Sequence, residues 1–212
     1  SVLVGDFLYS RAFQVLVGIA NLPIMGVMAD ATNVISEGEV QQMANAGNSN
    51  LTEDIYRQVI YRKTAKLFEA SALAGACLAN GDENSMVVYG RHLGMAFQIV
   101  DDVLDYSGDI LVTGKNIGDD LAEGKMTLPL IYARDVGTNS ESQLIKEAVS
   151  MKNSTNFDSI LKIVNRTGGL DYSLECARNE VELAKCALDS IPDNSYKETM
   201  LNLADFSLSR IS

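Results

Sequence analysis

The sequence is short of several residue types, and each shortage excludes a class of protein. Its 212 residues include three prolines, three cysteines and one histidine. Cys77, Cys176 and Cys186 are odd in number and have no Cys-x-x-Cys spacing, which argues against a disulfide framework and against a zinc site. We expect them to be small buried hydrophobes in a reducing compartment, and hence a cytoplasmic protein. His92 has no second histidine with which to form a metal site, so we expect it to be structural or solvated.

Positive charge is also in deficit. The chain has 17 Lys and Arg against 28 Asp and Glu, a formal net charge of −11, which argues against non-specific binding of nucleic acid. The first residues lack the basic region of a signal peptide, and no apolar run approaches the ~18–20 residues that a membrane span requires. We therefore expect no nucleic-acid partner and no transmembrane segment.

What the sequence contains instead is helical periodicity. Apolar residues recur at intervals of three and four along nearly the whole chain, and no strand-like alternation persists. The length suits one large domain or two small ones. The pattern predicts an all-helical protein, with a loop over residues 107–123 and helices over residues 2–18, 22–46, 52–80, 83–106, 128–136, 140–151, 156–166, 170–190 and 194–209.

The predicted helix that ends near Tyr106 carries three carboxylates inside an apolar run. Asp101 and Asp105 are four residues apart and share one helical face with Gln98, while Asp102 lies beside them in the chain. Like charges at this spacing cost an isolated helix about 0.2–0.5 kcal/mol per pair, so we expect a cation to bind there. A set of ligands that are all oxygen favours Mg²⁺ over a softer metal.

Two further segments supply lysines. Lys63 and Thr64 interrupt the apolar stripe of the third predicted helix, where the lysine either extends to the surface or points with the hydroxyl into a polar pocket. Lys115 and Lys125 each follow a glycine in residues 113–129, but this segment has the wrong spacing for a phosphate-binding P-loop and no strand precedes it. It is either a solvated loop or a flap whose lysines clamp a diphosphate.

These segments together resemble a known family. FQIVDDVLD at residues 97–105 and GKNIGDDLAEGKMTLP at residues 114–129 resemble the second aspartate-rich motif and adjoining loop of the trans-isoprenyl diphosphate synthases, the polyprenyl synthetase family. Lys63-Thr64 is similar to the Lys-Thr pair of that family. Residues 3–14 and 37–42 resemble its long-chain branch, and most of all the octaprenyl diphosphate synthases of the ubiquinone pathway.

The resemblance implies a single synthase domain over residues 1–212, built as a helical bundle around a central cavity, and a homodimer. It implies that an allylic diphosphate ionises with the help of Mg²⁺ and that isopentenyl diphosphate attacks the resulting cation. By residue, it implies that Asp101 binds the metal, Asp102 and Asp105 hold metal-bound water, Lys63, Lys115 and Lys125 contact the allylic diphosphate, and Thr64 and Gln98 direct oxygen dipoles at the developing cation.

Three other functions stay open. A terpene cyclase would use the same ionisation, but the chain lacks the Asn/Ser/Glu pattern of its second metal motif. A non-catalytic partner subunit of a heteromeric synthase has no need of Asp101, Asp102, Asp105 and Lys63. An acidic helical scaffold would leave Lys63-Thr64 and the lysine-bearing loop unexplained. Similarly, the apolar residues Phe7, Leu8, Phe13 and Met25 either line the path of a growing chain or pack in an ordinary core, and we favour the core.

The family's first aspartate-rich motif and its isopentenyl diphosphate site lie upstream of the segment that Ser1 matches. We therefore expect this sequence to be the C-terminal two-thirds of a synthase, with the N-terminal helices of the bundle missing. The 212-residue chain alone should bind metal-diphosphate poorly and should not turn over. An assay of the purified chain with both substrates and Mg²⁺ checks this, and measurable chain elongation would contradict it.

Overall fold

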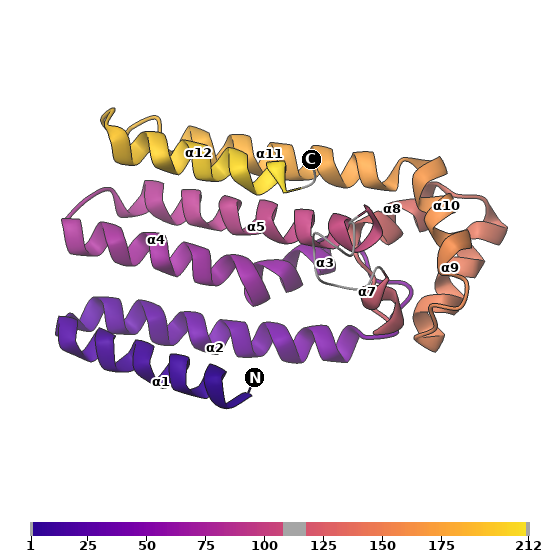
Figure 1. Ribbon diagram of the computed structural model, residues 1–212, viewed down its shortest axis with the longest axis horizontal. Coiled ribbons are helices and arrows are strands. Elements are labelled where there is room, and N and C mark those ends of the chain that lie inside the picture. Colours follow the sequence, from indigo (N-terminus) through magenta and orange to yellow (C-terminus); the bar gives the residue numbers. More distant parts are fainter. Residues whose placement is uncertain (1, 108–117, 211–212) are drawn as a thin grey trace.

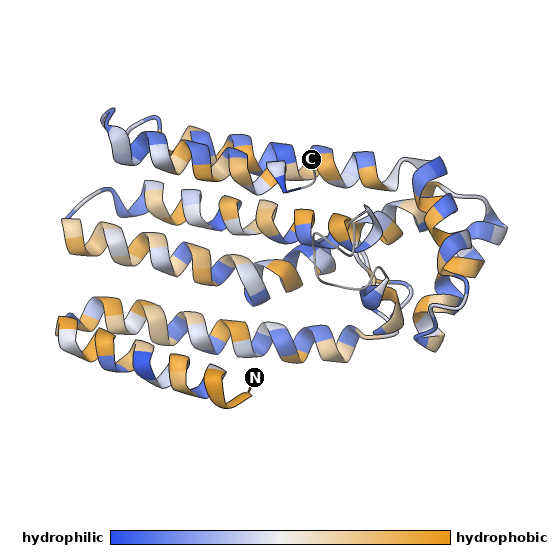
Figure 2. Ribbon diagram, in the orientation of Figure 1, coloured by the Kyte–Doolittle hydropathy of each residue, from blue (hydrophilic) through white to orange (hydrophobic). Residues whose placement is uncertain are grey.

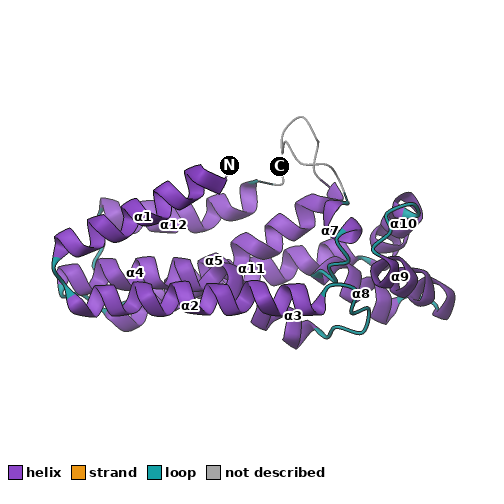
Figure 3. Ribbon diagram, turned by 90° about the horizontal axis from the view of Figure 1, so that it is seen from below, coloured by secondary structure: helices purple, strands orange, loops and turns teal. Residues whose placement is uncertain are grey.

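The computed structural model describes residues 2–107 and 118–210, and these two ranges contain helices, turns and loops but no β-strand (Figure 3). The predicted all-helical fold is therefore confirmed. The α-helices are α1 (Val2–Ile19), α2 (Leu22–Asn45), α3 (Glu53–Ile60), α4 (Lys66–Ala79), α5 (Glu83–Ser107), α7 (Asp119–Ala122), α8 (Leu128–Val136), α9 (Asn139–Met151), α10 (Phe157–Thr167), α11 (Gly169–Ala187) and α12 (Ser195–Ser209).

The long helices lie side by side along the long axis of the molecule (Figure 1). α4 and α5 pack against each other in the middle, with α2 against α4 on one side and α11 against α5 on the other. α1 covers part of α2, and α12 lies on α5 and α11. The shorter helices α8, α9 and α10 gather at one end (Figure 1). α5 is therefore the central helix of the bundle, and the residues it carries are held from several sides.

Local signals in the sequence set the ends of these helices. The Thr52 side chain accepts a hydrogen bond from Ile55 N and caps α3, as a threonine at this position is expected to do. Asn80 ends α4 in the left-handed conformation, with φ of 50°, which asparagine tolerates better than most residues. Both positions agree with the sequence prediction.

Two predicted elements need correction. The third predicted helix is interrupted between α3 and α4 by a π-helical turn, η1 (Tyr61–Ala65). The predicted loop over residues 107–123 contains the short helix α7. Gly118 has φ of 84° and precedes α7, so the chain turns sharply into a helix whose first residues are acidic, which the helix dipole favours.

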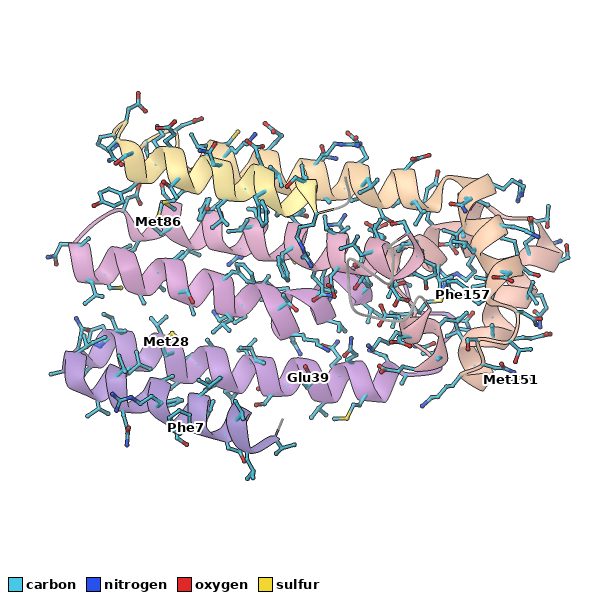
Figure 4. The ribbon with its side chains drawn as sticks, viewed as in Figure 1. Phe7, Met28, Glu39, Met86, Met151 and Phe157 are labelled. Atoms are coloured by element: carbon cyan, nitrogen blue, oxygen red, sulfur yellow. The ribbon has the colours of Figure 1, made fainter. Side chains whose placement is uncertain are left out.

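The outer helix α1 contains no buried residue. Phe7, which lies on this helix in Figure 4, is 65% exposed and Leu8 is 60% exposed, so the expectation that both pack in a core is wrong. Phe13 and Met25 are half-buried.

Apolar residues recur along α1 (Figure 2). By length and composition alone, this 18-residue helix would be able to cross a membrane, so the expectation that no segment reaches this length is also wrong. Helices that pack against other helices can have the same length and composition, so this test alone does not identify a membrane span.

The cysteines and His92 were only partly foreseen. All three cysteines are free, which confirms the absence of a disulfide, but Cys186 is exposed and Cys77 is half-buried; only Cys176 is buried as expected. His92 Nδ1 lies 2.7 Å from Glu180 Oε2. The histidine thus joins α5 to α11, which is the structural role that the sequence predicts for it.

Two glycines allow α5 to approach its neighbours at backbone distance. A Cβ atom at position 90 would lie 2.5 Å from Phe68 O and 2.8 Å from Glu69 Cα, and a Cβ atom at position 94 would lie 2.5 Å from Ala65 Cα. Such distances leave no room for a side chain, so α4 would have to move if Gly90 were replaced, and η1 would have to move if Gly94 were replaced.

We predict that Gly90→Ala destabilises the protein by about 1–3 kcal/mol, the usual cost of inserting atoms into a packed interior. Gly75→Ala on α4 is the control, because nothing lies within 4 Å of a Cβ atom there, and alanine in a helix should stabilise by roughly 0.5–1 kcal/mol. Denaturant unfolding of both variants measures the difference, and equal stabilities would contradict the prediction.

Candidate active site

A cavity of about 200 Å³ opens where α2, α3, η1, α5 and the segment after α7 meet. Its wall contains both charged and apolar side chains. Of the predicted functional residues, the cavity brings together Lys63, Gln98, Asp101, Asp102 and Lys125. Apolar side chains complete the wall: Leu51, Val59, Ile60 and Met126. Thr64 and Asp105 do not line the cavity but contact residues that do, and Lys115 lies outside the described residues.

A chain of hydrogen bonds runs through this wall from η1 to α3. Thr64 Oγ1 donates to Gln98 Oε1 at 2.7 Å, and Gln98 Nε2 donates to Asp102 Oδ1 at 2.8 Å. Tyr56 Oη donates to the other Asp102 oxygen at 2.7 Å. Since the carboxylate only accepts, it fixes the amide of Gln98 with its nitrogen toward Asp102 and its oxygen toward Thr64. Thr64 and Gln98, both singled out from the sequence, are therefore in direct contact.

Tyr56 has no place in the sequence prediction, although a signal for it exists. It precedes Lys63 by seven residues, about two helical turns, and so lies on the same side of the helix. Its phenol is 3% exposed and Asp102 is 5% exposed. A buried carboxylate is costly unless hydrogen bonds replace the water that it loses, and Tyr56 supplies one of these bonds.

Both described lysines already have partners in the wall. Lys63 Nζ donates to Gln42 Oε1 at 2.6 Å and lies 3.3 Å from Glu39 Oε1; Figure 4 places Glu39 on α2. Lys125 Nζ lies 2.8 Å from Asp120 Oδ1 and 2.7 Å from Glu123 Oε2. Lys63 lines the cavity, so the alternative in which it extends into solvent is not what the structure contains.

The aspartates occupy different environments. Asp101 lines the cavity, and its Oδ1 lies 3.6 Å from Arg210 Nη2. Asp105 Oδ2 accepts a hydrogen bond from the backbone N–H of Asp120 at 3.2 Å. Asp120, from the first turn of α7, also lines the cavity. It was not predicted as a site residue, because its position depends on how the chain returns to α5.

The carboxylate of Asp120 lies close enough to those of Asp102 and Asp105 to repel them. Burial and the nearby charge of Asp120 raise the pKa of Asp102 to about 7, against hydrogen bonds from Tyr56 and Gln98 that lower it. Burial and Asp120 likewise raise the pKa of Asp105 to about 7. Burial lowers the pKa of Lys125, but its bonds to Asp120 and Glu123 outweigh this effect and the net pKa is raised. The site therefore holds more negative charge than its lysines neutralise.

The residues present fit a hydrated divalent cation better than a closed cage. No cluster of three or more His, Cys, Asp or Glu side chains suited to a metal occurs within residues 2–107 and 118–210. However, Mg²⁺ keeps several waters and commonly uses one or two carboxylates plus ligand phosphates. The carboxylates and amides that line the cavity offer oxygen ligands, and both oxygens of Asp102 accept hydrogen bonds. Asp101 and Asp120 also line the cavity, and Asp105 contacts Asp120.

The raised pKa of Asp105 has a consequence for stability that can be measured without metal. Above pH 7 the buried charge destabilises the folded state; as the pH falls through 7 the folded protein takes up a proton that the unfolded chain, with a pKa near 4, does not. In EDTA at pH 8, Asp105→Asn should therefore be more stable by on the order of 1 kcal/mol after allowance for solvent screening. The gain should shrink at pH 5.

Thermal unfolding at the two pH values checks this, with a rise in Tm of about 2–4 °C expected at pH 8. Asp189→Asn, at an exposed position, is the control and should have no pH-dependent effect. A gain for Asp105→Asn that is equal at both pH values would show that the charge of this carboxyl is not its cause.

Comparison with known proteins agrees with this geometry. The chain is 46% identical over 214 residues to octaprenyl diphosphate synthase from Haemophilus influenzae and 43% identical over 214 residues to that from Escherichia coli; each alignment covers 99% of this chain. The chain spans 65% and 66% of the length of these two relatives.

Among solved structures, a polyprenyl synthase from Caulobacter crescentus, complexed with calcium and isoprenyl diphosphate, superposes with a TM-score of 0.94 at 38% identity, over 100% of this chain and 66% of that one. Heptaprenyl diphosphate synthase from Staphylococcus aureus gives a TM-score of 0.90 at 26% identity, over 100% of this chain and 67% of that one. Residues 1–167 match the family model described as polyprenyl synthetase. The chain therefore belongs to the polyprenyl synthetase family.

Proposed function

We propose that the complete protein is a trans-polyprenyl diphosphate synthase, which extends an allylic diphosphate with isopentenyl diphosphate. The observation that supports this most directly is that Lys63, Gln98 and Asp101 line one cavity together with apolar side chains. A diphosphate needs cations, and a hydrocarbon chain needs apolar surface. Relatives named as octaprenyl diphosphate synthases and a structural neighbour complexed with calcium and isoprenyl diphosphate support the same assignment.

Mg²⁺ is the proposed metal, and when bound it would neutralise charge on the departing diphosphate. Asp101 would bind it, and Asp102 and Asp105 would orient the water around it. Lys63 and Lys125 would hold the diphosphate oxygens as point charges. Lys115, on the predicted flap, is proposed to do the same.

The reaction breaks the allylic C–O bond, and the electron pair leaves with the diphosphate. The cation that remains would lie near Gln98 Oε1 and Thr64 Oγ1, whose mutual hydrogen bond fixes these oxygens before the reaction, so that little reorganisation is needed. The double bond of isopentenyl diphosphate then forms the new C–C bond. Loss of a proton from that adduct gives an allylic diphosphate that is longer by one isoprene unit.

The finer assignments follow from the relatives and are proposals as well. We propose a long product of octaprenyl type, destined for the side chain of a quinone. We also propose that the protein is cytoplasmic and acts as a homodimer.

The test uses the complete gene product, because the chain spans only part of its relatives. Incubation with farnesyl diphosphate, isopentenyl diphosphate and Mg²⁺ should give a long-chain product, measured by chromatography of the dephosphorylated alcohols. A product no longer than geranylgeranyl diphosphate would contradict the long-chain assignment, and no product at all would contradict the enzymatic one.

A metal-site variant separates the role of Asp101 from general damage. Asp101→Asn removes the charge but not the shape, so the Mg²⁺ concentration needed for half-maximal rate should rise by about 10–100-fold. Asp6→Asn, at an exposed position on α1, should leave it unchanged. An unaltered Mg²⁺ dependence in Asp101→Asn would remove Asp101 from the proposed metal site.

A further inference from the structure

The π-helical turn η1 carries Lys63, which lines the cavity, and Thr64, which contacts Gln98 in its wall. A π turn is wider than an α turn and is rare, because it packs less well and is seldom favoured by local sequence alone. It persists where the surrounding structure holds it. Lys63 lines the cavity and the hydroxyl of Thr64 contacts Gln98, so these consecutive residues both serve the site from within this turn.

α2 meets this turn at backbone distance through Gly38. A Cβ atom at position 38 would lie 2.7 Å from Lys63 N, 2.8 Å from Arg62 Cβ and 3.0 Å from Arg62 C. Gly38 is buried, whereas Gly26 on the same helix has nothing within 4 Å of its Cβ position. The absence of a side chain at position 38 therefore sets how closely α2 can approach the backbone that carries Lys63.

The next turn of α2 extends this contact to side chains. Gln42, four residues after Gly38 and on the same face, accepts a hydrogen bond from Lys63 Nζ at 2.6 Å. Glu39 lies 3.3 Å from the same ammonium group. Gln41 accepts a bond from Arg62 Nη1 at 3.3 Å. These contacts join α2 to η1 beside the close approach at Gly38.

α5 holds the other end of the turn. A Cβ atom at position 94 would lie 2.5 Å from Ala65 Cα, which is two residues after Lys63. The backbone around Lys63 and Thr64 is thus confined between one glycine on α2 and one on α5. A change at either glycine must displace η1, because backbone atoms cannot rotate away as a flexible side chain does.

We propose that Gly38 is a positioning residue: with Gln42 it fixes the π-helical turn so that the Lys63 ammonium group faces the diphosphate site. This inference rests on the proposed function. It assigns to α2, which carries no acidic metal motif, control over the geometry of the phosphate-binding lysine.

The experiment compares variants of the complete gene product. Gly38→Ala should lower kcat/KM by about 10–100-fold, the cost of displacing a catalytic contact by about 1 Å, and should weaken binding of inorganic pyrophosphate in Mg²⁺, measured by calorimetry. Gln42→Leu keeps the backbone contact and removes only the acceptor, so it should weaken pyrophosphate binding in the same direction even if Gly38→Ala does not fold.

Two controls separate positioning from general destabilisation. Gly90→Ala introduces an equally close clash, but against Phe68 and Glu69 on α4, so it should lower Tm without a matching loss of pyrophosphate affinity. Gly26→Ala should change neither. A loss of affinity in Gly90→Ala as large as that in Gly38→Ala would overturn the inference.

A double-mutant cycle with Lys63→Ala tests whether Gly38 acts through the lysine. Once Lys63 is absent, Gly38→Ala should cause no further loss of pyrophosphate affinity; a full additional loss would overturn the inference alone. If Lys63→Ala itself leaves pyrophosphate affinity and kcat/KM unchanged, the role of Lys63 in the proposed function is wrong, and this inference with it.

Discussion

Asp102 is carried into the interior by α5, where its carboxylate accepts hydrogen bonds from Tyr56 and Gln98. A charged group in such a place has to be compensated, or it will take up a proton. Tyr56 and Gln98 compensate it in part, and the rest of the site follows from this arrangement. The amide of Gln98 is oriented by Asp102, the hydroxyl of Thr64 is oriented by Gln98, and α3 is tied to α5 through Tyr56. One buried carboxylate thus fixes groups from three parts of the fold, α3, η1 and α5.

The electrostatic state of the site is a compromise. Asp102 and Asp105 both have a pKa raised to about 7 by burial and by Asp120, so the metal-free site is close to taking up protons at neutral pH. The folded state tolerates this destabilisation because α5 packs against α4, α11 and α12, which hold its aspartates in place. Perturbed carboxylates that gather at a cavity are typical of functional sites.

The sequence allowed the helices and the acidic face of α5 to be predicted, because both depend on local spacing. A motif singled out Thr64 and Gln98, but not the hydrogen bond between them. It did not allow the contact between Tyr56 and Asp102 to be predicted, since these residues are 46 positions apart and only the packing of α3 on α5 joins them. The π turn escaped prediction for a similar reason. Gly38 on α2 and Gly94 on α5 approach the backbone of this turn, and these contacts cannot be read from residues 61–65 themselves.

The exposure of Phe7 and Leu8 shows another limit of sequence patterns. Apolar periodicity indicates that a helix has a face to cover, but it does not say what covers it.

The existing partners of Lys63 and Lys125 affect which anions the cavity can bind. Lys63 and Lys125 are already engaged, by Gln42 and Glu39 and by Asp120 and Glu123. An incoming anion therefore exchanges partners with these side chains and does not meet bare cations. In such an exchange a chloride ion gains little, because one hydrogen bond replaces another. A diphosphate offers many oxygens and several charges at once, so each lost contact can be replaced by more than one new one. The existing partners of the two lysines therefore favour anions of high charge over anions of single charge.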